Sequence, residues 1–384
     1  MPQRAHTILC IVGTRPEAIK MAPVINRLRF EPWARVRVAE TGQHPEMTRA
    51  MLDLFGIGRD IVLDTFRPGQ SLAALSSRLI DALDRVIDET MPDLVLVQGD
   101  TTSAMVGALT AFYRRLPVAH VEAGLRTSRI DRPFPEELNR RIAGLVGSLH
   151  FAPTARARDA LVAEGVDPGS VFVTGNPVID ALLDIAAREP ACPLSIDPER
   201  RVVLVTAHRR ESHGSPIAEI CAGVADLLAR FPDVEAVWPV HPNPAVRAPI
   251  RAALAGNDRV RLVDPLDYAG LVALMRRSSL VLTDSGGLQE EAPALGKHVL
   301  VLREETERME AVEAGVATLV GASRRRIVEE ASRRLRDGAP VAAAGLSPFG
   351  DGLAAHRIAQ HAQAFLTRRS GAAEPPALTR VAAR

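Results

Sequence analysis

The chain alternates between short apolar runs and longer amphipathic segments along nearly its whole length. The short runs have the composition of buried parallel strands, and the longer segments have the spacing of amphipathic helices. Strands are predicted at 7–12, 36–41, 94–98, 118–121, 149–152, 171–174, 202–206, 235–240, 260–263, 280–283, 299–302 and 317–320. Helices are predicted between them, among others at 18–29, 72–89, 102–114, 154–164, 217–230 and 324–336. This alternation predicts an α/β fold of parallel sheets covered by helices on both faces.

The predicted strands form two series, separated by the Pro- and Cys-containing stretch 188–201. Two Rossmann-like domains are therefore expected, at 1–177 and 178–351. Residues 367–384 are polar and rich in Pro and Ala, so we expect a disordered tail there. Ligands of parallel sheets bind beyond the carboxyl ends of the strands, which makes the loops at those ends the candidate sites.

Composition excludes several classes of function. The 384 residues carry 47 Lys and Arg against 46 Asp and Glu, so no net field favours nucleic acid or an anionic membrane. Cys10, Cys192 and Cys221 fit neither a disulfide framework nor a zinc spacing. No apolar run reaches membrane-spanning length, and the N-terminal residues lack a signal-peptide cleavage pattern. A cytoplasmic protein is expected.

The stretch after the strand at 280–283 has the character of an anion site. Asp284-Ser285-Gly286-Gly287 breaks the apolar pattern, and a helix is predicted from Leu288 to Leu295. Backbone N–H groups and the helix dipole at such a turn attract phosphate, and glycine lets it approach closely. Glu290 and Glu291, one turn into the helix, are placed to accept hydrogen bonds from a ribose. The alternative is a tight turn that needs only the glycines.

The loop after the first strand adds positive charge. Arg15 and Lys20 put two cations at a helix start, which suits a diphosphate, although a solvated basic face is the simpler interpretation. No G-x-G-x-x-G sequence follows any predicted strand, which argues against a dinucleotide cofactor.

Three carboxylates occupy candidate catalytic positions. Asp100 follows one predicted strand and suits either a catalytic carboxylate or the N-cap of the next helix. Glu122 follows another strand and has no evident capping role. Glu136 enters a helix after a proline-stiffened loop, where a helix salt bridge with Arg140 at i,i+4 is the alternative.

His208 directly follows the strand at 202–206, between an alanine and two arginines, so it suits a catalytic or phosphate-contacting role. His208, Glu211 and His213 match no zinc-binding helix motif, and no metal is expected. Arg308 follows a later strand and is expected to face the same site.

Together these loops resemble the bacterial non-hydrolysing UDP-N-acetylglucosamine 2-epimerases. The resemblance covers nearly the whole chain and is carried by GTRPEAIKMAP (13–23), QGDTTSA (98–104), HVEAGLRT (120–127), PFPEELNRR (133–141), TGNPVIDAL (174–182), TAHRRES (206–212), PVHPNP (239–244), DSGGLQEEAPALGK (284–297) and ETER (305–308). It implies a GT-B arrangement of the two domains around a central cleft, with a last helix at about 352–366 returning to the first domain. It also implies a homodimer that binds a UDP-sugar without NAD or metal.

Residue roles follow from the same resemblance. It implies that UDP-sugar is bound by Arg15, Lys20, Asp100, Glu122, His208, Ser285, Gly286, Gly287, Glu291 and Arg308. Asp100, Glu122, Glu136 and His208 are implied to be catalytic. A second, activating UDP-sugar site is implied for Gln43, Glu136, Arg210 and His241, while Glu46 and Gly69 differ from some relatives there. Leu266 and Leu271 stand where relatives carry Gln and Phe near the uracil.

The expected reaction is interconversion of UDP-N-acetylglucosamine and UDP-N-acetylmannosamine, by elimination and re-addition of UDP. A hydrolysing epimerase that releases ManNAc and UDP, a GT-B glycosyltransferase and a non-catalytic nucleotide-sugar sensor are the alternatives. A modified sugar, such as a diacetamido-uronic acid, is also compatible with these motifs. The sequence does not assign acid and base among Asp100, Glu122 and Glu136.

Overall fold

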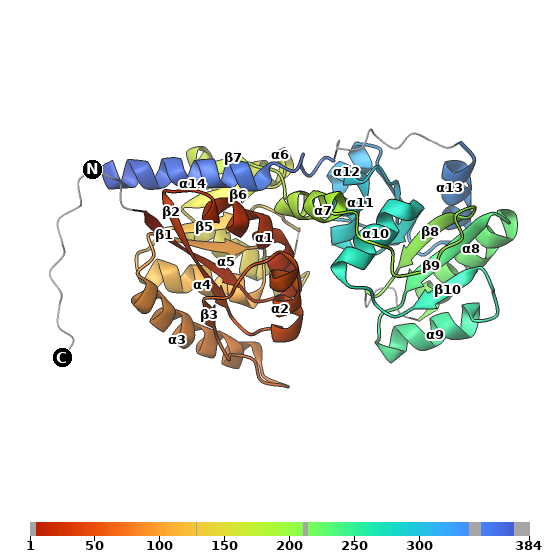
Figure 1. Cartoon of the computed structure of the whole chain (residues 1–384), viewed down its shortest axis with the longest axis horizontal. Helices are drawn as coiled ribbons and strands as arrows, with labels where there is room; N and C mark the ends of the chain where they lie inside the picture. The colour runs from red at the N-terminus through yellow and green to blue at the C-terminus, as the bar shows by residue number, and fades with distance from the viewer. Residues whose placement is uncertain (1–4, 128, 210–213, 338–346, 372–384) are drawn as a thin grey trace. The chain divides into compact units, whose positions relative to one another are not determined.

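The computed structural model describes residues 5–127, 129–209, 214–337 and 347–371. Contacts divide the chain into two compact units, which are described separately. Unit 1 comprises Met1–Pro177 with Leu353–Arg384, and unit 2 comprises Val178–Gly352. Each contains one all-parallel sheet, of seven strands in unit 1 and six in unit 2 (Figure 1). The predicted class, two parallel-sheet Rossmann-like domains, is confirmed.

Unit 1 has the strand order β3-β2-β1-β4-β5-β6-β7. Its strands are β1 (His6–Val12), β2 (Ala34–Glu40), β3 (Ile61–Val62), β4 (Leu94–Gln98), β5 (Val118–Val121), β6 (Leu149–Ala152) and β7 (Val171–Val173). Its helices are α1 (Arg15–Arg29), α2 (Pro45–Leu54), α3 (Leu72–Thr90), α4 (Thr102–Tyr113), α5 (Glu136–Val146), α6 (Ala155–Ala163), the 3-10 turn Pro168–Ser170 and α14 (Ala354–Gly371). The order reverses between β1 and β4, so the loops after these strands diverge and leave room for a ligand.

Unit 2 has the order β10-β9-β8-β11-β12-β13, which reverses between β8 and β11. Its strands are β8 (Arg201–Thr206), β9 (Val234–Pro239), β10 (Val260–Val263), β11 (Ser278–Thr283), β12 (Val299–Val301) and β13 (Ala317–Leu319). Its helices are α7 (Pro177–Ala187), α8 (Ser215–Arg230), α9 (Pro244–Leu254), α10 (Tyr268–Arg277), α11 (Gly286–Ala294), α12 (Met309–Glu313) and α13 (Arg324–Asp337). His208 follows β8, and the Gly-rich turn Ser285-Gly286-Gly287 follows β11, the two strands at this reversal.

The cores lie where the apolar periodicity predicts them. In unit 1, alternate residues of β1 and β4 pack under α3 and α4, with Leu9, Ile11, Val95 and Val97 fully buried. In unit 2, Trp238 is fully buried in a cluster formed by β8, β9, β11 and the helices α8, α9 and α13. Burial of apolar side chains stabilises both cores, and the packed cores hold the strand ends at fixed positions.

The structure differs from the expected elements in several places, and strand β3 was not predicted. Helix α1 begins at Arg15 rather than residue 18, because Pro16 is tolerated in a first helical turn. The two-residue strand β3 is too short to give a periodic signal. Helix α14 continues through Gly371, so residues 367–371 are helical and not part of a disordered tail. Arg368 and Arg369 suit its last turn, where cations interact favourably with the helix dipole. The rest of the expected tail, 372–384, lies outside the described residues.

Helix α14 returns to unit 1 and packs beside α1, as Figure 1 shows. Its Arg357 guanidinium donates a 3.1 Å hydrogen bond to the carbonyl of Thr174, near the end of the first stretch of unit 1. The last helix therefore stabilises the loop that leads out of this unit. None of the helices in the described ranges is both long and apolar enough to cross a membrane.

Candidate functional site

A pocket of about 350 Å³ opens in unit 1 at the reversal between β1 and β4. Its ionisable and amide lining residues include Glu17, Lys20, Gln43, Gln98, Asp100, Glu122, Glu136 and Asn139. The pocket is therefore lined by several of the residues that the sequence singled out. Arg15 is half-buried at the start of α1 but does not line the pocket, and it has no ion pair with another described residue.

Glu122 is held in an unusual conformation at the carboxyl end of β5. Its φ of +61° lies in the left-handed region, which is unfavourable for a residue with a side chain and persists only where surrounding contacts enforce it. Lys20 Nζ lies 2.5 Å from Glu122 Oε1, and Asn176 Nδ2 donates to the same oxygen over 2.9 Å. Gln98 Nε2 donates to Oε2. These donors fix the carboxylate in one orientation.

Asp100 is not the helix cap that local sequence allowed. The N-cap of α4 is Thr101, whose hydroxyl accepts a hydrogen bond from the amide of Ala104. The Asp100 carboxylate instead points to Arg140, whose Nη2 lies 2.6 Å from Oδ2. Burial in the pocket raises the pKa of Asp100, and the neighbouring Arg140 partly opposes this shift.

The salt bridge between Glu136 and Arg140, the alternative that local spacing allowed, does not form among the described residues. Arg140 points to Asp100 and to Glu137 Oε2, at 3.5 Å, because its side chain extends back over the loop after β4. Glu136 stays at the pocket wall, and its buried Oε2 has no hydrogen-bond partner among the residues that the structure describes. A buried acceptor of this kind is available to a ligand donor.

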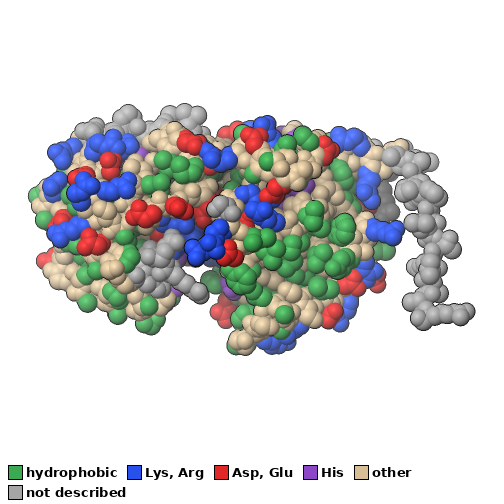
Figure 2. Space-filling view, turned by 180° about the vertical axis from the view of Figure 1, so that it is seen from behind, with side chains coloured by type: hydrophobic (Ala, Val, Ile, Leu, Met, Phe, Trp, Pro, Cys, Tyr) green, Lys and Arg blue, Asp and Glu red, His purple; other side chains and the backbone are tan. Residues whose placement is uncertain are grey.

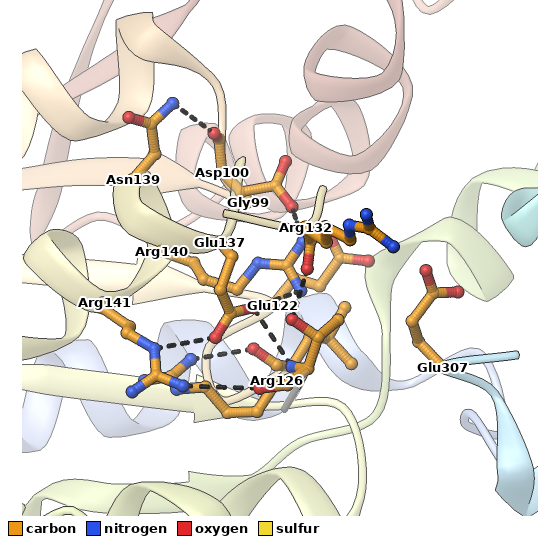
Figure 3. A network of polar contacts seen from close by, with 12 residues as sticks. Gly99, Asp100, Glu122, Arg126, Arg132, Glu137, Asn139, Arg140, Arg141 and Glu307 are labelled. Carbon is orange, nitrogen blue, oxygen red and sulfur yellow. Dashed lines mark hydrogen bonds and ion pairs between the residues drawn. The ribbon is translucent and has the colours of Figure 1, made fainter. Parts of the chain in front are cut away.

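Asp100 belongs to a chain of ion pairs that continues through Arg140 and Glu137 to Arg141, as Figure 3 shows. Glu137 is fully buried and accepts from Arg141 Nε at 2.8 Å and from the amide of Thr127 at 3.1 Å. Glu137 also neutralises Arg140, which in turn contacts Asp100. Because each buried charge in this chain is paired, the arrangement fixes the first turn of α5 against the pocket.

The Gly-rich turn of unit 2 joins β11 to α11, which begins at Gly286 rather than Leu288. A Cβ atom on Gly286 would lie 3.2 Å from Cζ of Arg308, so glycine lets the guanidinium lie against the helix start. Arg308 Nε also donates to Glu290 Oε1 over 2.8 Å. Glu307 Oε2 lies 3.6 Å from Arg308 Nη1, so two carboxylates offset the charge of this guanidinium. The helix N-terminus beside it presents backbone N–H groups to an anion.

Glu291 lies on the same helix, next to the turn. A Cβ on Gly287 would be 3.6 Å from Glu291 Oε2, which places the carboxylate close to the helix start. Its Oε1 accepts a 2.7 Å hydrogen bond from the hydroxyl of Tyr268, the first residue of α10. Sequence reasoning missed Tyr268, because nothing local to α10 indicates that it reaches α11.

His208 follows β8 and lies beside the Gly-rich turn. Its backbone amide and that of Arg209 donate to Asp284 Oδ2, at 2.8 and 2.9 Å. The imidazole packs on His241, with ring centroids 5.8 Å apart and planes 16° apart. Burial lowers the pKa of His208, and the nearby Asp284 opposes this shift. Arg210 lies outside the described residues.

The structure thus brings the predicted residues together in two groups. The group in unit 1 is Lys20, Gln43, Asp100, Glu122 and Glu136, and the group in unit 2 is His208, His241, Ser285, Gly286, Gly287, Glu291 and Arg308. No cluster of three or more metal-ligating side chains occurs among the residues that the structure describes.

Comparison with known proteins identifies the family of the chain. Residues 26–363 match the family model described as UDP-N-acetylglucosamine 2-epimerase. The chain belongs to this family. A UDP-N-acetylglucosamine 2-epimerase of Escherichia coli K12 is 46% identical over 367 residues, which cover 91% of this chain and 96% of that protein.

Solved structures of the epimerase family share the fold. A putative UDP-N-acetylglucosamine 2-epimerase from Listeria monocytogenes is 40% identical, with a TM-score of 0.86 over 95% of this chain and 97% of that one. The UDP-GlcNAc 2-epimerase of Neisseria meningitidis, solved bound to UDP-GlcNAc, is also 40% identical, with a TM-score of 0.85 over 93% and 100% of the two chains. The family resemblance that the motifs indicated is confirmed.

Proposed function

We propose that this chain catalyses the reversible C2 epimerisation of UDP-N-acetylglucosamine to UDP-N-acetylmannosamine. The observation that carries the proposal is the pocket of unit 1, where Asp100, Glu122 and Glu136 gather beside Lys20. Family membership supports the same reaction, since the similar proteins of Escherichia coli and Neisseria meningitidis bear the epimerase name.

The reaction requires such a group of carboxylates. The hydrogen on C2 is not next to a carbonyl, so a base alone does not remove it at neutral pH. When the bond between C1 and the UDP oxygen begins to break, positive charge develops at C1 and acidifies the C2 hydrogen. A carboxylate then takes the proton, UDP leaves with the bonding electrons, and a glycal forms. Protonation of C2 from the opposite face and return of UDP to C1 give the epimer.

UDP departure is assigned to unit 2. The Ser285-Gly286-Gly287 turn and Arg308 provide backbone donors and a cation, which stabilise the negative charge of the leaving diphosphate. Glu291 accepts from the ribose, in place of or beside its hydrogen bond to Tyr268. His208 and Arg15 complete the proposed binding set, and no cofactor takes part in these steps.

Proton NMR of the purified protein with UDP-GlcNAc alone, in D₂O, tests the proposal. Epimerisation gives UDP-ManNAc with deuterium at C2, because the abstracted proton exchanges with solvent before a deuteron is returned. Prolonged incubation should label UDP-GlcNAc as well, and traces of UDP and glycal should accumulate. Free ManNAc with UDP would indicate a hydrolase, and protium retained at C2 would indicate a hydride mechanism. Absence of turnover is the result expected of a glycosyltransferase without its acceptor or of a non-catalytic sensor.

Activation by a second UDP-sugar is the regulatory part of the proposal. Gln43 and Glu136 line the same pocket as Asp100. A buried oxygen of Glu136 has no hydrogen-bond partner within the described ranges, which supports binding of a further ligand nearby. His241 packs on His208, so a ligand at His241 would contact the proposed catalytic histidine. Arg210 is the remaining member of this set. A lag in the reaction from UDP-ManNAc alone tests the second site.

We also propose a homodimer formed through unit 1. Phe112, Tyr113 and Leu145 are 54%, 64% and 84% exposed, and hydrophobic side chains gather on the face of this unit seen in Figure 2. Apolar surface of this kind is typical of interfaces. Analytical ultracentrifugation of the wild type and Leu145→Glu tests it, with a monomeric wild type as the contrary result. Cell fractionation tests the expected cytoplasmic location. We expect the product to be used in polysaccharide synthesis.

A further inference from the structure

One buried carboxylate connects the two loops at the strand-order reversal of unit 2. Asp284 is fully buried and immediately precedes the Ser285-Gly286-Gly287 turn. Its Oδ2 accepts from the amides of His208 and Arg209, and its Oδ1 lies 3.3 Å from His208 Nδ1. Both the backbone and the ring of His208 are therefore adjacent to one acid from the neighbouring strand end.

We propose that Asp284 is the positioning residue of His208, which it holds in the tautomer with the proton on Nδ1. The catalytic consequence rests on the proposed epimerase function, whereas the pairing itself does not. A carboxylate can only accept, so a neutral imidazole facing it must present N–H at Nδ1. The other nitrogen, Nε2, is then unprotonated and able to exchange a proton at the site.

The surroundings of the ring favour this orientation. The two atoms are at ion-pair distance rather than in an aligned hydrogen bond, which is common for catalytic pairs until substrate tightens them. The ring of His241 lies nearly parallel to the imidazole, with the centroids 5.8 Å apart. The side chain of His208 is 42% exposed, so the ring is open on its remaining sides. Among the described residues, no group hydrogen-bonds Nε2.

The anchoring strand ends are themselves joined. The hydroxyls of Thr206 and Thr283, the last residues of β8 and β11, are 2.6 Å apart, and the Asp284 amide donates to the Thr206 carbonyl over 3.2 Å. The amide of Ser285 donates to the Thr283 hydroxyl over 2.9 Å. Asp284 is bonded both to these strand ends and to the loop of His208. It therefore fixes His208 relative to the Gly-rich turn.

Asp284→Asn is the decisive variant. The Asn carbonyl still accepts from the amides of His208 and Arg209, so the loop is retained, while its NH₂ group faces Nδ1 as a donor. The imidazole must then accept at Nδ1 and carry its proton on Nε2. A wrong tautomer of this kind removes proton transfer without removing the side chain, and turnover is expected to fall by roughly 10²-fold or more.

Long-range ¹H–¹⁵N NMR of ¹⁵N-histidine-labelled full-length protein at pH 8 reads the tautomer directly, and a His208→Gln spectrum assigns the signal. The expected result is Nδ1–H in the wild type and Nε2–H in Asp284→Asn. Thr206→Val, which breaks only the hydroxyl pair at the same strand ends, is the control and should keep Nδ1–H. A wild-type His208 with its proton on Nε2 overturns the proposal even if Asp284→Asn does not fold.

Kinetics supply the second measurement. In the UDP-GlcNAc assay, kcat of Asp284→Asn should fall while UDP affinity stays within about threefold, and adding the change to His208→Gln should cost no further activity. Unaltered kcat with an inverted tautomer removes the positioning role. Absence of turnover in the wild type refutes the epimerase function alone, because the tautomer measurement needs no turnover.

Discussion

Glu17 provides a quantitative test of the pocket in unit 1. The side chain is 1% exposed on α1, where Oε2 accepts from the amide of Gly13 over 3.1 Å. Thr101, the N-cap of α4, donates its hydroxyl to Oε1 over 2.7 Å. Glu17 therefore joins the loop after β1 to the loop after β4, which carries Asp100. Burial raises the pKa of Glu17 from its ordinary value of 4.5 to about 7, against the opposing effect of these hydrogen bonds.

The sign of the resulting pH dependence follows from proton uptake. Between pH 4.5 and 7 the folded protein holds a proton on Glu17 that the unfolded chain has released. The free energy of unfolding therefore falls as pH rises through this window, by an amount on the order of 3 kcal/mol in total. Above pH 7 both states are ionised and the contribution becomes constant.

The Glu17→Gln variant removes this titration and keeps the shape of the side chain. Its amide oxygen can accept from Gly13, and its NH₂ group can donate to the hydroxyl of Thr101. The stability of Glu17→Gln relative to wild type should therefore rise between pH 5 and 7, with a slope of up to about 1.4 kcal/mol per pH unit, and level off by pH 8.

Urea denaturation at pH 5, 6, 7 and 8 measures this difference. In a Trp238→Phe background, Trp33 is the only tryptophan and reports on unit 1. Glu89→Gln, an exposed change on α3 of the same unit, is the matched control and should show no such slope. A stability difference for Glu17→Gln that is constant within about 0.5 kcal/mol from pH 5 to 8 would refute the reasoning.

Three further predictions concern the reaction. Glu291→Ala should weaken UDP binding by about 1–3 kcal/mol in calorimetry, and Tyr268→Phe, which leaves the carboxylate, by less; unchanged affinity in Glu291→Ala excludes the ribose contact. Asp100→Ala and Glu122→Ala should each reduce turnover by roughly 10²-fold with nearly native thermal melts, whereas full activity of either removes it from proton transfer. The reaction from UDP-ManNAc alone should lag until UDP-GlcNAc is present, and Gln43→Ala should change the lag; a hyperbolic rate without a lag contradicts the second site.

Several features were predictable because they are local in the sequence. Apolar runs of strand length between amphipathic segments specify parallel sheets, and the carboxyl ends of such strands carry the loops that bind ligands. The Gly-rich turn before α11 was predictable for the same reason, since a strand, two glycines and a helix start are contiguous. Boundaries were less accurate where the periodic signal was short or absent, as at β3 and the end of α14.

The partners of the site residues were decided only by tertiary structure. The i,i+4 spacing allowed Arg140 to pair with Glu136, whereas in the folded chain Arg140 pairs with Asp100, 40 positions away. Asn176 donates to Glu122 across 54 positions, and Asp284 contacts the backbone of His208 across 76. A side chain selects its partner by distance, burial and donor geometry, which depend on how strands are ordered in the sheet. Periodicity along the chain reports which face of an element is buried, and it carries no information about which distant residue faces it there.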